Sequence, residues 1–66
     1  MKANRKKIEL AMARECLNIA ELARKAKMPE PSVKNALYEH SVRPATIGRI
    51  ARALGVDPVD IIETEE

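Results

Sequence analysis

With 66 residues, the chain has room for one domain, which we expect to span residues 1–66, and a domain this small buries only about 60% of its unfolded surface. It contains no Phe or Trp and one Tyr, so aliphatic side chains and Met must fill a thin core. Gly is scarce, and the helix-forming residues Ala, Leu, Lys, Arg and Glu dominate. This composition predicts an all-α fold rather than a sheet.

The formal net charge of +2 is unevenly distributed along the chain. Residues 57–66 hold five acidic side chains and no basic one, which leaves a formal charge of +7 on residues 1–56. A basic body of this kind is typical of a protein that meets a polyanion. Lys and Arg that only solvate helix surfaces would give the same balance.

Several function classes are disfavoured by composition. No apolar segment is long enough to span a membrane or to act as a secretory signal. A lone Cys cannot build a disulfide framework or a metal site. One His, one Cys and no Gly-rich phosphate loop argue against an enzyme. We therefore expect a cytoplasmic protein that is not an enzyme and needs no membrane, metal or cofactor.

Two helices are predicted in the first half of the chain. The first covers residues 4–15, with Asn4 as its cap. The second begins after Asn18, because Glu21 follows at the spacing of a capping box, and ends near Met28. Their inward-facing positions recur at helical spacing. These positions are Ile8, Ala11, Met12 and Glu15 or Cys16 in the first helix, and Ile19, Leu22, Ala23 and Ala26 in the second.

A third helix is predicted over residues 30–38. Prolines near its start are tolerated, because N–H groups in the first turn have no intrahelical acceptor. Residues 39–45 are predicted to form a loop, because the residue before Pro44 avoids the helical region. A fourth helix covers residues 46–54 and ends at Gly55.

A short fifth helix is expected after Asp57, with Pro58 at its first position. The acidic tail, about residues 63–66, is expected to fray. Together the elements predict a compact five-helix bundle. Its centre is expected at Leu22, Val33, Ile47, Ile50, Leu54 and Ile61.

The second and third predicted helices are joined by three or four residues, which is the layout of a helix-turn-helix motif. In that motif the second helix lies in the DNA major groove and the first crosses the phosphate backbone. Asn18 is then placed to hold a phosphate through its side chain and the free N–H groups of its helix.

Several segments resemble a known family. LNIAELARKA (17–26), Val33, Arg43-Pro44 and IARALGV (50–56) are similar to the helix-turn-helix domains of phage 434 repressor and Cro, the Xre or Cro type. The register runs without gaps over most of the chain. The resemblance implies a five-helix DNA-binding domain that regulates transcription, usually as a dimer on a palindromic operator.

Five positions depart from the pattern common in that family. Ile19 stands where Gln commonly contacts phosphate, and Lys27 stands where Gly commonly forms the turn. Pro29 replaces a capping Ser or Thr. Glu30 and Pro31 replace polar reading residues at the start of the third helix.

A further departure concerns a buried ion pair. Many family members pair an Arg of the first helix with a Glu late in the third, and the matching positions here hold Met12 and Leu37. Two packed apolar side chains often replace a buried ion pair without loss of stability.

The exposed positions of the third helix are the candidates for base contacts. Asn35 occupies a family reading position and can bond adenine through two hydrogen bonds, and Lys34 can reach a guanine or a phosphate. Glu30 can accept a hydrogen bond from cytosine N4, and Pro31 offers an apolar surface to a thymine methyl group. We expect Asn35 and Lys34 to carry much of the discrimination.

The phosphate-contact candidates are Asn18, Ser32, Tyr38, His40 and Arg43. Four of the base- and phosphate-contact candidates also have a structural alternative: Asn35 can simply face solvent, Tyr38 can lie half in the core, His40 can be an exposed loop residue, and Arg43 can brace the loop. A basic start to the chain is equally consistent with phosphate contacts and with plain solvation. Its members are Lys2, Arg5, Lys6 and Lys7.

The leading interpretation is a sequence-specific DNA-binding regulator, a small stand-alone repressor that places its third helix in the major groove. A homodimer would have to form through the domain itself, with Val56, Val59 and Ile62 as the candidate surface. One alternative is an antitoxin that binds both DNA and a toxin, with the acidic tail meeting that protein partner. Another is a protein-interaction module that has lost DNA binding.

Overall fold

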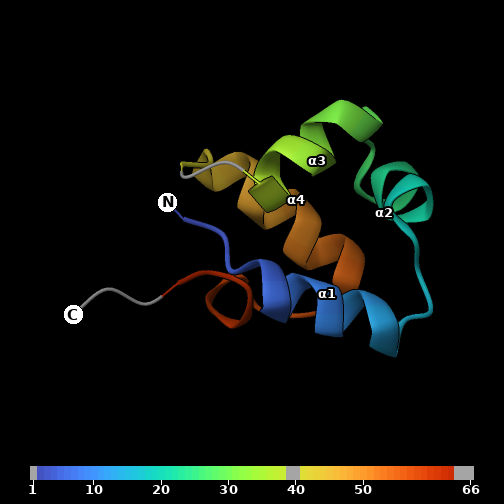
Figure 1. Ribbon diagram of the computed structural model, residues 1–66, viewed down its shortest axis with the longest axis horizontal. Helices are drawn as coiled ribbons and strands as arrows, with labels where there is room; N and C mark the ends of the chain where they lie inside the picture. The colour runs from blue at the N-terminus through green and yellow to red at the C-terminus, as the bar shows by residue number, and fades with distance from the viewer. Residues whose placement is uncertain (1, 39–40, 64–66) are drawn as a thin grey trace.

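The computed structural model describes residues 2–38 and 41–63, which form four α-helices and one 3-10 turn without a β-strand (Figure 1). This confirms the predicted all-α class. The elements are α1 (Arg5–Arg14), α2 (Ile19–Ala26), α3 (Glu30–Tyr38), α4 (Pro44–Leu54) and the 3-10 turn η1 (Pro58–Asp60). None of the helices in these ranges is long and apolar enough to cross a bilayer.

The caps of α1 and α2 lie where the sequence predicts them. Asn4 Oδ1 accepts a hydrogen bond from the Lys7 N–H at 3.1 Å. Asn18 Oδ1 accepts from the Glu21 N–H at 2.8 Å, and Glu21 Oε1 accepts from the Asn18 N–H at 3.0 Å. The second pair is the predicted capping box, so local side-chain chemistry fixes the start of α2.

The turn between α2 and α3 contains Lys27 in the left-handed conformation, with φ 58°. The Met28 N–H returns to the Ala23 carbonyl at 2.9 Å and so closes α2. The Pro29 carbonyl accepts from the Ser32 N–H at 3.0 Å and so opens α3. A tight turn therefore fixes α3 against α2, and a Lys in this left-handed conformation carries a conformational cost that Gly would not.

The fourth helix begins earlier than predicted. Pro44 is its first residue, so the loop prediction is wrong for residues 44–45. Proline suits the first helical position, since no N–H is needed there and its φ is already helical. Its restriction falls on Arg43, which is extended at φ −67° and ψ 143° and serves as the N-cap. Residues 39–40 of the predicted loop lie outside the described residues.

The predicted count of five helices is wrong. The expected fifth helix is only a three-residue 3-10 turn. Asp57 Oδ1 accepts from the Val59 N–H at 3.0 Å, and Asp60 Oδ2 accepts from the Asp57 N–H at 3.2 Å. These two bonds close the turn on itself. The chain then becomes extended at Ile62 rather than continuing as a helix.

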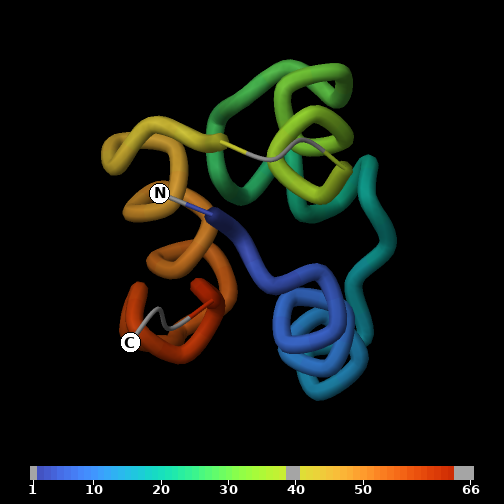
Figure 2. Tube along the Cα trace, turned by 60° about the vertical axis from the view of Figure 1, so that its left-hand side comes forward, coloured from blue at the N-terminus to red at the C-terminus, as the bar shows by residue number. Residues whose placement is uncertain are grey.

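The two ends of the described chain pair with each other. Ala3 and Ile62 form an isolated antiparallel bridge, and both termini lie on one side of the molecule (Figures 1 and 2). The Glu63 N–H donates to the Lys2 carbonyl at 2.9 Å, and Lys2 Nζ lies 3.3 Å from Glu63 Oε2. The prediction that the tail frays is therefore wrong for Glu63, while residues 64–66 lie outside the described residues.

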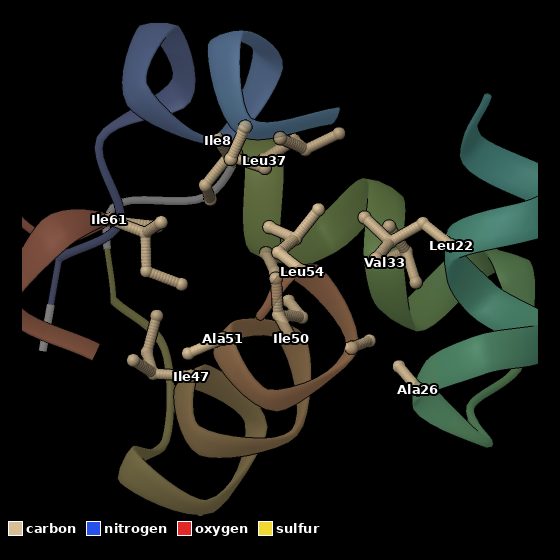
Figure 3. Packing of buried hydrophobic residues seen from close by; sticks show 14 of the residues in the cluster. Ile8, Leu22, Ala26, Val33, Leu37, Ile47, Ile50, Ala51, Leu54 and Ile61 are labelled. Carbon is tan, nitrogen blue, oxygen red and sulfur yellow. The ribbon is translucent and has the colours of Figure 1, made fainter. Parts of the chain in front are cut away.

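The core surrounds α4, which packs against α2, α3 and η1. Figure 3 shows side chains from every helix converging there, with Leu22 and Val33 approaching each other from α2 and α3. All six residues predicted at the centre are buried. Met12 and Leu37 are buried as well, as expected for an apolar replacement of an ion pair. The described residues bury no polar or charged side chain.

Candidate nucleic-acid interface

The outward side of α3 carries all four predicted base-contact residues. Packing buries the opposite side, which consists of Val33, Ala36 and Leu37. At about 100° per residue, the outward residues fall within an arc of about 140°, and all are exposed. They are Glu30, Pro31, Lys34, Asn35 and Tyr38.

Glu30 and Pro31, at the start of the exposed side of α3, suit a helix N-terminus independently of any contact with bases. Glu30 lies in the first turn of α3, where a negative charge is favoured by the helix dipole. Pro31 also lies in that turn, where its missing N–H costs nothing. Lys34 follows one turn later and offsets the charge of Glu30. The α3 face is thus close to neutral, and any attraction to phosphate must come from its flanks.

One flank is a polar hollow between α3 and the start of α4. Its lining residues are Ser32, Asn35, Ala36, Ser41, Val42, Arg43 and Thr46. Hydroxyl, amide and guanidinium groups there can all donate hydrogen bonds to an anion. The structure therefore brings two predicted phosphate contacts, Ser32 and Arg43, beside the predicted base reader Asn35.

The N-terminus of α4 adds to this hollow. The N–H groups of Ala45 and Thr46 lie in the first turn of α4 and have no intrahelical acceptor, and Arg43 makes no side-chain cap to them. Free N–H groups and the positive end of the helix dipole favour a phosphate. Ser41 and Thr46 were missed at the sequence level. Placing Pro44 as the first helical residue would have put Thr46 in the first turn and revealed it.

The second flank is the start of α2. Asn18 is exposed, and its Oδ1 is used by the capping box, which leaves its amide Nδ2 as the donor for a phosphate. Ile19 is partly buried and packs against the core. The residue that replaces the family's Gln therefore contributes packing instead of a polar contact.

The start of α1 lies beside the C-terminal end of α3. The Arg5 guanidinium carbon is 5.1 Å from the centre of the Tyr38 ring, a cation–π arrangement. Arg5 Nε also lies 3.8 Å from Glu9 Oε2. Tyr38 is 59% exposed, so the half-core alternative is wrong. Of the basic residues at the start of the chain, Arg5 is thus directed to the α3 face; His40 lies outside the described residues.

Two of the three candidate dimer residues, Val56 and Val59, line one hollow, whereas Ile62 does not. Val59 is 56% exposed, whereas Val56 and Ile62 are partly buried and Ile62 pairs with the N-terminal segment. The hollow lies between α1 and η1 and joins Val56 and Val59 to Leu10, which is 63% exposed. Leu10 was not among the residues predicted from the sequence. It is an apolar residue outside the buried stripe of α1, and that position is the signal that could have identified it.

No group of three His, Cys, Asp or Glu side chains that could hold a metal lies among residues 2–38 and 41–63. Cys16 is an exposed free thiol between α1 and α2. Its backbone is left-handed, with φ 54°, and it helps to turn the chain between α1 and α2.

Two helices joined by a tight turn, with the second exposed along its length, define a helix-turn-helix domain. The model of the Cro/C1-type HTH DNA-binding domain family matches residues 7–66. The chain belongs to this family, which confirms the resemblance read from the sequence. It is a DNA-binding domain of the transcription-regulator kind, and its partner is double-stranded DNA. Comparisons with curated proteins and with solved structures gave no significant match.

Proposed function

We propose that this protein is a sequence-specific repressor that binds a palindromic operator as a homodimer, with α3 in the major groove. The observation that carries this proposal is the exposed α3 face between two flanks whose polar groups can bind phosphate. These flanks are the capped start of α2 and the polar hollow at the start of α4. Phosphate contacts on both sides of a reading helix fix its register on the duplex.

Within this proposal, base contacts are divided along α3. Asn35 bonds adenine, and Lys34 bonds guanine or an adjacent phosphate. Glu30 accepts from cytosine N4, and Pro31 contacts a thymine methyl group. The phosphate contacts are those of Asn18, Ser32, Tyr38 and Arg43, joined by Arg5. A contact by His40 stays a prediction from the sequence.

The hollow between α1 and η1 supports the dimer. Its apolar lining consists of Leu10, Ala11, Val56, Val59 and Ile61, of which Leu10 and Val59 are exposed. Lys7 and Arg14 line its α1 side, and Asp60 lines its η1 side. A two-fold axis places the basic side of one copy against the acidic side of the other, as an isologous interface requires. Such a dimer sets two α3 helices about 34 Å apart, one turn of DNA.

The experiment that tests this function is a selection from random duplex DNA, followed by titration of the recovered sites at several salt concentrations. We expect an enriched palindrome with half-sites about ten base pairs apart and an affinity that falls steeply with salt. Salt-sensitive binding without enrichment would contradict sequence-specific reading. Absence of binding at low salt would instead favour a protein-interaction module.

A matched pair of variants tests the division of roles on α3. Asn35→Ala is expected to cost about 1–3 kcal/mol of binding free energy at one operator position and to relax specificity there. Lys34→Ala is expected to weaken all sequences similarly and to reduce the salt slope by about 1 if Lys34 contacts a phosphate. Unchanged discrimination by Asn35→Ala on the selected operator would show that this residue does not read bases.

A further inference from the structure

A second charged surface lies away from α3. We call it the basic groove, and its lining residues are Glu15, Lys25, Ala26, Lys27, Arg49, Arg52, Ala53 and Gly55. Four of these side chains are cationic and one is acidic. Neither α3 nor the described segment before α4 contributes to it. The groove is therefore distinct from the surface proposed to bind the operator.

The position of the basic groove on α4 separates it from the polar hollow. Thr46 lines the hollow, whereas Arg52 lines the groove. The three groove residues of α4, Arg49, Arg52 and Ala53, follow Thr46 by three to seven residues, which is about 4.5–10.5 Å of rise. The groove thus lies nearer the C-terminal end of α4 than the hollow does, and the two share no lining residue.

Stabilisation of the helix ends accounts for only part of this charge. Lys25 lies in the last turn of α2, Lys27 follows α2 directly, and Arg52 lies in the last turn of α4. The negative end of the helix dipole stabilises cations at these positions. Arg49 is in the middle of α4 and gains nothing from that effect. Lys25 Nζ already lies 3.9 Å from Glu15 Oε1 at the rim. Among the ion pairs of the described residues, none includes Lys27, Arg49 or Arg52.

The chemistry of the groove favours a peptide over a nucleic acid. Its floor contains the small buried side chains of Ala26 and Ala53. Both α2 and α4 end at the groove, with Lys27 and Gly55 as their left-handed end residues. The Ala23, Arg24, Ala51 and Arg52 carbonyls already accept hydrogen bonds from the residues that close the two helices. The carbonyls that lack an intrahelical donor are therefore those of Lys25, Ala26, Ala53 and Leu54. A phosphodiester backbone offers only acceptors to such an end, whereas an acidic peptide offers carboxylates to the cations and N–H groups to the carbonyls.

We propose that the basic groove is a docking site for an acidic peptide segment of a protein partner. The regulator then holds DNA on α3 and an acidic protein at the C-terminal ends of α2 and α4. This adds a partner to the proposed operator binding and does not depend on it. The occupant is recognised by closely spaced carboxylates on a backbone whose intervening side chains are small.

The test uses nitrogen-labelled full chain and a synthetic peptide of about ten residues that alternates Glu and Ala, with a Gln–Ala peptide as the neutral control. We expect the acidic peptide to shift the amide NMR signals of Ala26, Ala53 and Gly55 and to leave those of Lys34 and Asn35 unchanged. The neutral peptide should shift neither set. Shifts centred on α3, or no shifts, would overturn the proposal.

Two variants separate the groove from the operator surface. Arg49→Ala combined with Arg52→Ala should weaken peptide binding about tenfold, since each removes an exposed ion pair, and should leave operator affinity unchanged. Lys34→Ala, the matched control, should weaken DNA binding and leave peptide binding unchanged. Thermal unfolding of each variant verifies that it is folded. If a short DNA duplex shifts the groove signals and the acidic peptide does not, the groove is a nucleic-acid surface and the proposal is wrong.

Discussion

At the residue scale, two non-glycine residues hold left-handed backbone conformations. Cys16 lies in the connection between α1 and α2 and has φ 54°. Lys27 lies in the turn between α2 and α3 and has φ 58°. A side chain with a Cβ is disfavoured there by roughly 1–2 kcal/mol. The turn of this helix-turn-helix is therefore built at a cost that glycine would avoid, and the rest of the domain must offset it.

We expect Lys27→Gly to raise the free energy of unfolding by up to about 1 kcal/mol, because glycine removes the left-handed strain but gains freedom in the unfolded chain. Lys25→Gly, two residues earlier inside α2, should lower it by about 1 kcal/mol. Urea denaturation of both variants measures the difference. A loss of stability in Lys27→Gly would mean that its side chain contributes more than the turn geometry indicates.

At the element scale, the start of α2 combines two tasks. The Asn18 side chain accepts from the Glu21 N–H, and the Glu21 side chain accepts from the Asn18 N–H. Asn18 is exposed, and its amide Nδ2 remains as a donor that can bind a phosphate. Stability and DNA affinity at this position can be separated, because the cap needs only an acceptor and the phosphate needs a donor.

Asn18→Asp is therefore expected to leave the free energy of unfolding within about 0.5 kcal/mol of the parent, since Asp and Asn cap equally well. Its DNA affinity should fall by about tenfold, because a carboxylate replaces the donor and repels phosphate. Asn18→Ala should lose about 1 kcal/mol of stability as well as affinity. Calorimetry for unfolding and fluorescence anisotropy with operator DNA provide both measurements; equal affinity of the Asp variant would remove Asn18 from the interface.

At the scale of the whole molecule, the domain is closed by contacts between its ends. The Asn4 N–H donates to the Ile61 carbonyl at 2.8 Å, next to the bridge between Ala3 and Ile62. The side chain of Ile61 is fully buried. The residue before α1 is thereby held to the residue after η1, and the last apolar side chain of the core is locked in place.

Ile61→Ala is expected to cost about 2–5 kcal/mol, which is comparable with the few kcal/mol that a core of this size supplies. Most of the chain should then be unfolded at 37 °C. Val59→Ala, a change two residues away at a 56% exposed position, should alter stability by less than about 0.5 kcal/mol. Circular dichroism during thermal unfolding distinguishes the two, and a well-folded Ile61→Ala would show that the end of the chain is not part of the cooperative core.

The dimer is also a property of the whole molecule. Leu10→Glu places a charge in the apolar hollow and should make the protein monomeric in sedimentation, with a loss of cooperative binding to the two half-sites. Leu10→Met keeps the apolar volume and should leave the dimer intact. A dimer that survives Leu10→Glu, with unchanged operator binding, would place the interface elsewhere.

Residues close together in the sequence determined what was predicted correctly. The caps at Asn4 and Asn18, the limits of α3 and the buried stripes depend on side chains within a few positions of each other, where helical spacing and capping chemistry act. The main local error concerned Pro44, whose effect on the preceding residue was given more weight than its fitness for the first helical position. The second was the length of η1, because capping signals begin a turn without specifying how long it continues.

Only the tertiary structure decided the contacts between distant segments. These include the pairing of the chain ends, the cation–π contact of Arg5 with Tyr38 and the apolar hollow containing Leu10. The convergence of four cations on the basic groove from α2, the turn after it and α4 is of the same kind. The sequence by itself determined a helix-turn-helix with an exposed α3, because hydrophobic periodicity acts along a single helix. The surfaces around α3 depend on how helices pack, and packing joins residues that no local spacing relates.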